Sequence, residues 1–130
     1  MDDLDRCVVV IVDDHPEVAD SLALLVEGMG YGAITLTDAR DVADVVDFHR
    51  PHIVLMDIDM PEMNGWDVAA HLRQCCEGRH LALVAVTGLD SAEARHKSAG
   101  AGFDAHVVKP LRAQTLEDLI RRFGHCKATS

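Results

Sequence analysis

The sequence contains no apolar run long enough to cross a membrane, and its first residues, MDDLDR, are acidic, unlike those of a secretory signal. Basic residues are scarce, since 12 Lys and Arg stand against 22 Asp and Glu, which gives a formal net charge of −10. Phosphate backbones are bound by basic patches, so this charge argues against direct binding of nucleic acid. We therefore expect a cytoplasmic protein that does not insert into membranes and that binds cations or basic surfaces.

Cysteine spacing typical of a metal site or a disulfide framework is also absent. The four cysteines, Cys7, Cys75, Cys76 and Cys126, include no CxxC pair. This pattern favours reduced and mostly buried thiols. A redox role for the adjacent Cys75 and Cys76 is the alternative.

Repeats, linkers and low-complexity segments are missing, and 130 residues leave room for one domain with a single core. We predict that this domain covers residues 7–123, with an N-terminal extension at 1–6 and a C-terminal tail at 124–130. No output domain is expected after residue 123.

Five apolar runs alternate with segments in which apolar residues recur at helical spacing. The first run, CVVVIV, is rich in β-branched residues, which is typical of a strand covered on both faces. The predicted strands are 7–12, 31–36, 53–56, 81–86 and 103–108. Strands that alternate with helices predict an α/β fold, in which helices cover both faces of a parallel sheet.

Several residues predict where the helices begin and end. Pro16 suits the first turn of the first helix, Thr37 or Asp38 can cap the second, and Ser91 caps the fourth, which ends at Gly100. The fourth helix offers only alanines for its inner side. In the first helix one apolar stripe is expected to face the core: Val18, Leu22, Leu25, Val26 and Met29.

Polar side chains follow four of the predicted strands, at the point where each strand ends: Asp13 and Asp14, then Asp57 and Asp59, then Thr87, then Lys109. In a parallel sheet these ends share one edge, where ligands bind. Carboxylates that converge there repel one another, and a hard divalent cation such as Mg²⁺ relieves the repulsion through oxygen ligands. Together with a lysine and a hydroxyl, an acid nucleophile at this edge predicts a site for phosphoryl transfer.

Four motifs, in this order and spacing, resemble the receiver domain of two-component response regulators: VDDHP at 12–16, LMDIDMPEMNGWD at 55–67, VTG at 86–88 and VVKP at 107–110. The resemblance covers residues 7–123. It implies a flavodoxin-like (βα)5 domain with strand order 2-1-3-4-5. It also implies a signalling module that catalyses only its own phosphorylation and dephosphorylation.

The resemblance assigns a role to each acid at the sheet edge. It implies that Asp57 is the phosphoacceptor and that Asp13 and Asp14 are the acidic pair that holds Mg²⁺. The backbone carbonyl of Asp59 is implied as a further metal ligand. We expect the side chain of Asp59 to turn to solvent, from where it could order or repel an attacking water.

The same resemblance implies that Thr87 and Lys109 contact the phosphoryl oxygens and that the Lys109–Pro110 peptide bond is cis. In this family the phosphoryl group comes from a phosphohistidine on a histidine kinase or a histidine phosphotransfer protein, and hydrolysis later resets the site. The signal then passes through the face formed by the fourth helix, the fifth strand and the fifth helix. The sequence does not identify the cognate kinase, the downstream protein partner, the phosphoryl lifetime or the oligomeric state.

One residue departs from the family pattern. His106 stands where family members carry Tyr or Phe, the ring that swings inward when the threonine hydroxyl moves toward the phosphoryl group. Imidazole is smaller and more polar, so a weaker bias toward the active state is expected. Trp66 is expected to pack over the opening turn of the third helix, and the eight histidines are expected at the surface without a ligand role.

Three other interpretations remain possible at this point. The DxD in LMDIDMP also resembles haloacid dehalogenase phosphatases, but Met60 follows Asp59 and the acidic pair precedes the nucleophile strand. A flavin- or nucleotide-binding module on the same fold lacks its GxGxxG motif. A receiver-like domain that works without phosphorylation would lack an acid, the threonine or the lysine, and none is missing. The chain is either a stand-alone regulator or the receiver of a hybrid kinase.

Overall fold

The computed structural model describes residues 7–60, 64–75, 81–88 and 91–124, and within them strands and helices alternate as predicted. No helix in these ranges is long and apolar enough to cross a membrane. The elements are β1 (Val8–Val12), α1 (Pro16–Gly28), β2 (Gly32–Leu36), a 3-10 turn η2 (Ala39–Asp41), α2 (Val42–His49), β3 (Ile53–Asp57), α3 (Gly65–Cys75), β4 (Ala82–Thr87), α4 (Ala92–Ala101), β5 (Ala105–Val108) and α5 (Ala113–Phe123).

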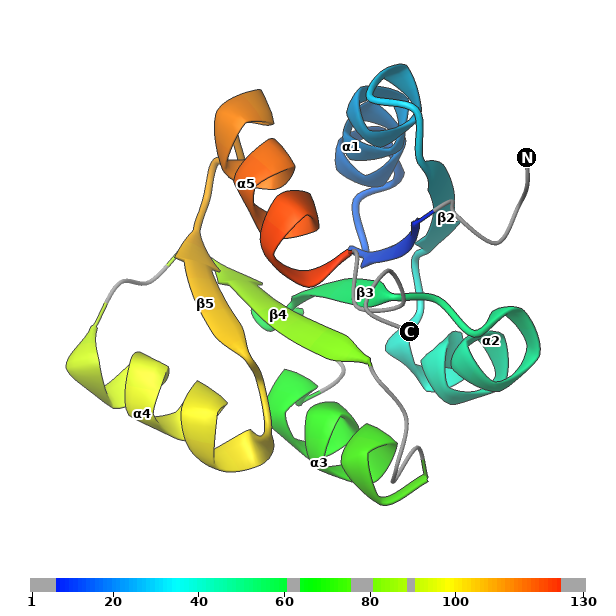
Figure 1. Ribbon diagram of the computed structural model, residues 1–130. Helices are drawn as coiled ribbons and strands as arrows, with labels where there is room; N and C mark the ends of the chain where they lie inside the picture. Colours follow the sequence, from blue (N-terminus) through cyan, green and yellow to red (C-terminus); the bar gives the residue numbers. More distant parts are fainter. Residues whose placement is uncertain (1–6, 61–63, 76–80, 89–90, 125–130) are drawn as a thin grey trace.

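The five strands form one parallel sheet in the order β2-β1-β3-β4-β5, which confirms the predicted flavodoxin-like topology. One row of the register runs from Ile34 through Val10 and Val54 to Leu83. Because every strand runs the same way, all five carboxyl ends point to the same edge of the sheet (Figure 1).

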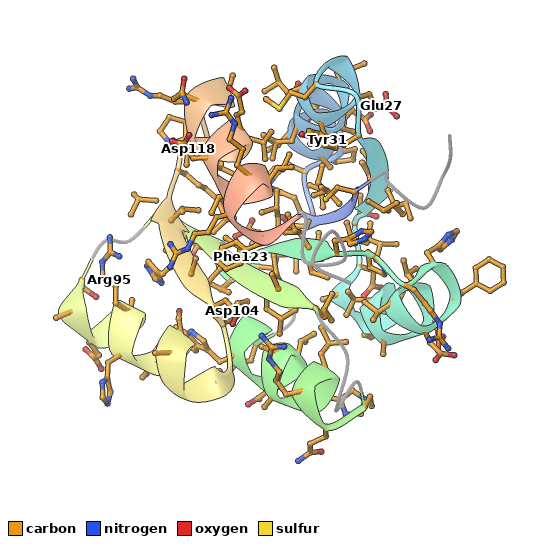
Figure 2. The ribbon with its side chains drawn as sticks, in the orientation of Figure 1. Glu27, Tyr31, Arg95, Asp104, Asp118 and Phe123 are labelled. Carbon is orange, nitrogen blue, oxygen red and sulfur yellow. The ribbon has the colours of Figure 1, made fainter. Side chains whose placement is uncertain are left out.

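Each face of the sheet carries its own apolar core. Helices α1 and α5 cover one face, and α2, α3 and α4 cover the other (Figure 1). Figure 2 shows that side chains fill the space between the sheet and the helices on both sides. Strands β3 and β4 are buried along their whole length, which explains why they are continuous apolar runs rather than alternating ones. The two central strands therefore hold their carboxyl ends rigidly.

The predicted starts of three helices agree with the structure. Pro16 is the first residue of α1. The side chain of Asp38 accepts a hydrogen bond from the Arg40 amide at 2.9 Å, so Asp38 is the capping residue, and it caps the short 3-10 turn that leads into α2. Ser91 caps α4 by accepting a hydrogen bond from the Ala94 amide at 3.0 Å.

The predicted inner faces of α1 and α4 need correction. In α1, Ala19 and Val26 are buried, whereas Val18 and Leu25 are 44% and 38% exposed. In α4, Ser98 is buried as well as alanine, and the helix continues to Ala101, where Gly102 ends it in the left-handed conformation. The apolar stripe of α1 is wider than the surface that the sheet and α5 cover, so its margin stays exposed.

The prediction of mostly buried thiols holds for only one of the two described cysteines. Cys7 is buried in the core under α1 and α5, whereas Cys75 is exposed at the end of α3. Neither of these two cysteines forms a disulfide. Cys76 and Cys126 lie outside the described residues.

Arg73 on α3 ties together three segments at the amino end of the sheet. Its Nε donates to the carbonyl of Gly102 at 2.9 Å and one terminal nitrogen donates to the carbonyl of Leu81 at 2.8 Å. The other terminal nitrogen forms an ion pair with Asp104, whose carboxylate also accepts the amide of Leu83 at 2.9 Å. The guanidinium thereby satisfies backbone groups that the helix and strand ends leave unpaired.

We predict that Arg73→Ala lowers the free energy of unfolding by about 2–3 kcal/mol, because hydrogen bonds to a charged group are lost and two carbonyls lose their donors. Chemical denaturation measures this change. Arg121→Ala is the matched control, since Arg121 makes an exposed pair with Glu117 on the same helix, and such pairs contribute about 0–1 kcal/mol. Equal effects of the two changes would contradict the assignment of Arg73 as a clamp.

Candidate functional site

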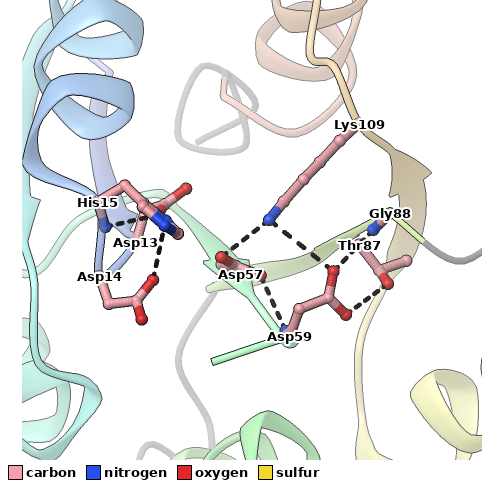
Figure 3. A network of polar contacts seen from close by, with 8 residues as sticks. All are labelled: Asp13, Asp14, His15, Asp57, Asp59, Thr87, Gly88 and Lys109. Atoms are coloured by element: carbon pink, nitrogen blue, oxygen red, sulfur yellow. Dashed lines mark hydrogen bonds and ion pairs between the residues drawn. The ribbon is translucent and has the colours of Figure 1, made fainter. Parts of the chain in front are cut away.

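The carboxyl edge of the sheet carries the polar residues that the sequence singled out (Figure 3). Asp13 and Asp14 directly follow β1, Asp57 is the last residue of β3, Thr87 is the last residue of β4, and Lys109 directly follows β5. Strand order places β3 between β1 and β4. Asp57 therefore lies at the centre of the edge, between the acidic pair on one side and the hydroxyl and lysine on the other.

An acidic cluster forms around Asp57. Potential ligand atoms of Asp13, Asp14, His15 and Asp57 all lie within 4.8 Å of one another. Asp13 and Asp57 are 4% and 3% exposed, and Asp14 is partly exposed. The Nδ1 of His15 lies 3.3 Å from an oxygen of Asp13 and 3.1 Å from an oxygen of Asp14. His15 is exposed, as expected for the histidines, and its ring lies beside the acidic pair, which the sequence analysis did not indicate.

The donor set of this cluster suits a hard divalent cation. Three carboxylates supply the oxygen ligands that Mg²⁺ prefers, and Mg²⁺ is commonly bound by one or two carboxylates together with water. A cation here would also offset the repulsion among Asp13, Asp14 and Asp57, two of which are buried. The residues present therefore fit Mg²⁺. The backbone carbonyl of Asp59 as a further ligand stays a prediction.

Lys109 supplies a positive charge to the other side of Asp57. Its Nζ donates to Asp57 Oδ2 at 2.9 Å and lies 3.8 Å from Asp59 Oδ2. Burial alone would lower the pKa of Lys109, but the hydrogen bond and charge of Asp57, with the charges of Asp13 and Asp59, outweigh it and raise the pKa. The lysine is therefore charged at neutral pH, and its charge is lost as the pH rises through its raised pKa.

Backbone contacts hold Lys109 and the turn after Asp57 in place. The Lys109 amide donates to the carbonyl of Thr87 at 2.8 Å, and the peptide bond between Lys109 and Pro110 is cis. On the other side, the amide of Ile58 donates to the carbonyl of Val86 at 3.0 Å. These bonds continue the sheet pairing past the ends of the strands, so the reactive side chains project from rigid backbone.

Gly65 lets helix α3 begin directly against that turn. A Cβ at this position would lie 2.7 Å from the Cγ2 and 3.0 Å from the Cα of Ile58, closer than the turn can accept. Glycine is therefore required at position 65, because helix α3 lies so close to the turn at Ile58.

The side chain of Asp59 is exposed, as predicted from sequence, but both of its oxygens also accept hydrogen bonds, which the sequence did not indicate. Its Oδ1 accepts the hydroxyl of Thr87 at 2.8 Å and its Oδ2 accepts the amide of Gly88 at 2.7 Å (Figure 3). The side chain is 41% exposed, and its own amide donates to Asp57 Oδ1 at 2.8 Å. Thr87 is 1% exposed, so its hydroxyl needs an acceptor inside the protein, and the carboxylate of Asp59 supplies it.

A second polar group, which the sequence analysis missed, joins α3, α4 and β5. The indole Nε1 of Trp66 donates to Ser98 Oγ at 3.1 Å, and His106 Nδ1 lies 3.0 Å from the same oxygen. Ser98 is 1% exposed, and the Nε2 of His106 is buried with no hydrogen-bond partner among the described residues. Trp66 thus reaches across to α4, where Lys97 lies 5.0 Å from its ring centroid. The sequence contained one indication of this role for Ser98. Ser98 is a polar residue one turn after Ala94, on a face of α4 that otherwise carries alanines.

A carboxylate at the centre of a parallel sheet edge, with an acidic pair on one side and a hydroxyl and a lysine on the other, is the arrangement that the resemblance to receiver domains implied. The family model for the response regulator receiver domain matches residues 9–121. The chain belongs to this family. It is a signalling module rather than a conventional enzyme, which decides against the phosphatase and flavin alternatives. The predicted domain borders at 7 and 123 stay a prediction.

The chain is similar both to proteins of about its own length and to one segment of much longer proteins. The polar-differentiation response regulator DivK of Brucella anthropi is 29% identical over 88% of this chain and 94% of its own length. The sensor histidine kinase RcsC of Salmonella typhimurium is 31% identical over 92% of this chain, which covers only 12% of that kinase. The receiver domain of Saccharomyces cerevisiae Ssk1, solved with the histidine phosphotransfer protein Ypd1, shares the fold at 18% identity. The match covers 95% of this chain and 92% of that one, with a TM-score of 0.87.

We predict that Mg²⁺ raises the melting temperature of the protein, because it binds the folded acidic cluster and offsets its repulsion. At ten times the dissociation constant the gain is about 1.4 kcal/mol. Asp13→Asn should gain clearly less, since it removes one ligand and one charge. Thermal melts in chelator and in Mg²⁺ measure both effects, with Asp20→Asn, an exposed acid on α1, as the charge-matched control. A full Mg²⁺ gain in Asp13→Asn would contradict the site.

Proposed function

We propose that Asp57 accepts a phosphoryl group from a phosphohistidine on a cytoplasmic histidine kinase or histidine phosphotransfer protein, in a Mg²⁺-dependent reaction. One observation carries the proposal: Asp57 is 3% exposed, yet it lies within the acidic cluster on one side and 2.9 Å from Lys109 Nζ on the other. A rigidly held acid with a cation partner is suited to act as a nucleophile.

In the proposed step, a carboxylate oxygen of Asp57 bonds to phosphorus while the P–N bond of the phosphohistidine breaks. The electron pair of that bond stays on the imidazole nitrogen, which then takes a proton. Lys109 and Thr87 donate to the phosphoryl oxygens. Asp13 and Asp14 would hold Mg²⁺, which would neutralise part of the phosphoryl charge. Hydrolysis of the acyl phosphate later restores Asp57.

We assign the docking of the donor to a groove between α1 and the segment after β5. The groove has a volume of about 410 Å³, and its lining includes Asp13 and Lys109 together with the partly exposed Val18, Leu25 and Leu111. Because two site residues form part of its wall, a protein seated there lies directly beside Asp57. Apolar side chains around the site supply the contact area that a protein donor needs. The complex of Ssk1 with Ypd1 shows that a protein of this fold binds a histidine phosphotransfer protein.

The output of the proposed reaction is a conformational change of the face formed by α4, β5 and α5. Thr87 ends β4, and its carbonyl accepts a hydrogen bond from the amide of Lys109. A movement of Thr87 toward a phosphoryl group would therefore also move the end of β5. His106 on β5 is bonded to Ser98 on α4, in place of a free aromatic ring. A downstream protein that contacts this face would read the change.

The first prediction concerns the phosphoacceptor. With Mg²⁺ and acetyl phosphate, the intact mass should rise by one phosphoryl group, because Asp57 attacks any sufficiently activated donor. Asp57→Asn should abolish the increase, since an amide is not a nucleophile, whereas Asp20→Asn should retain it. Intact mass spectrometry is the measurement. Incorporation that survives in Asp57→Asn, or that is equal in chelator, would show that the acceptor lies elsewhere.

The second prediction separates docking from chemistry. Leu25→Asp places a charge in the groove and should slow phosphotransfer from a phosphorylated histidine phosphotransfer protein at least about tenfold, the effect of losing about 1.4 kcal/mol of contact. Its phosphorylation by acetyl phosphate should be unchanged, because the small donor needs no groove. Phe48→Asp is the control, since Phe48 is 81% exposed on α2, on the other face of the sheet. Equal transfer rates for wild type and Leu25→Asp would rule out this docking surface.

A further inference from the structure

The carboxylate of Asp59 already occupies donors at the end of β4. Its two oxygens accept the hydroxyl of Thr87 at 2.8 Å and the amide of Gly88 at 2.7 Å, and Lys109 Nζ lies 3.8 Å away. Figure 3 shows this carboxylate beside Asp57, on the side away from the acidic pair. A carboxylate and a phosphoryl group are both anionic and both accept hydrogen bonds through oxygen.

One of these donors is also required by the phosphoryl group, because under the proposed function Thr87 and Lys109 donate to phosphoryl oxygens. A hydroxyl has a single proton to donate. The hydroxyl of Thr87 therefore cannot serve both the carboxylate of Asp59 and a phosphoryl oxygen on Asp57 at full strength. The two anions therefore compete.

We propose that Asp59 is a resting-state latch: its carboxylate stands in for the phosphoryl group, holds Thr87 in the inactive arrangement and must release it before the domain switches. This inference rests on the proposed function of Asp57. It adds to the role expected for Asp59 from sequence, because the exposed side chain also acts on the switch threonine. Asp59 is a positioning residue, since it acts through Thr87.

The latch sets how strongly the phosphoryl group drives the switch. A ligand that needs free donors binds with an affinity reduced by the fraction of molecules in which the donors are free. If the latch is closed in about nine-tenths of the molecules, the apparent affinity falls about tenfold. Lys109 keeps its bond to Asp57 at 2.9 Å, so the latch acts on Thr87 and Gly88 more than on the lysine.

Charge repulsion between Asp59 and a bound anion would also weaken binding. This repulsion can be distinguished experimentally from competition for the hydroxyl of Thr87. Repulsion between Asp59 and a phosphoryl group does not depend on the hydroxyl of Thr87, whereas the latch does. Removing Asp59 should therefore matter less when Thr87 has already been changed to valine. A double-mutant cycle measures this coupling.

The test uses beryllofluoride, a phosphoryl mimic, with Mg²⁺, and follows binding through backbone amide NMR. We expect Asp59→Ala to bind about tenfold more tightly than wild type. In chelator, the amide proton of Gly88 should move upfield in Asp59→Ala, because it loses a charged acceptor. Asp67→Asn, which removes an exposed acid in the first turn of α3, should change neither result.

In the cycle, Asp59→Ala should increase the affinity clearly less in the Thr87→Val background than in wild type. An equal increase in both backgrounds would mean repulsion only and would overturn the latch, as would unchanged affinity in Asp59→Ala. Absence of binding to every variant and to wild type, in Mg²⁺, would instead overturn the proposed function of Asp57.

Discussion

The ion pair between Lys109 and Asp57 is the interaction on which the rest of the site depends. Asp57 ends a fully buried strand and is 3% exposed, and a buried carboxylate that loses its partner typically costs about 3–5 kcal/mol. Lys109 reaches it from β5, two strands away in the sheet. The same contact raises the pKa of the lysine, so the site keeps one positive charge among its acids at neutral pH. The edge of the sheet can therefore carry a nucleophile without unfolding.

Around this pair the site divides into two functional halves. Asp13, Asp14 and His15, on the side of β1, form the half suited to a cation. Asp59 and Thr87, on the side of β4, form the half whose hydrogen bonds a new anion would rearrange. Beyond that half, the bonds of Ser98 join α3, α4 and β5, so the elements around the output face are linked by polar contacts as well as by apolar packing. Phosphorylation at the centre would act on both halves, through charge in the first and through competition for donors in the second.

The fold was predictable because it depends on patterns that are local in the sequence. Apolar runs of strand length, alternating with helical periodicity, predicted the parallel sheet, and capping residues such as Ser91 marked helix starts correctly. The errors occurred where a neighbouring element decides burial. Val18 and Leu25 match the apolar stripe of α1 but lie beyond the surface that the sheet and α5 cover. Periodicity indicates which residues share a face of a helix, and it does not indicate how wide the opposing surface is.

By itself, the sequence determined which chemical groups stand at the carboxyl edge, because strand ends in a parallel sheet meet there whatever their distance along the chain. Only the tertiary structure decided how those groups pair. Asp59 bonds to Thr87, 28 positions further along, and His15 joins the acidic cluster although histidine spacing gave no sign of it. Ser98 is linked to Trp66 and His106 from two other elements. Hydrogen-bond partners depend on distances of a few tenths of an ångström between side chains from different strands and helices, and no pattern along one segment contains that information.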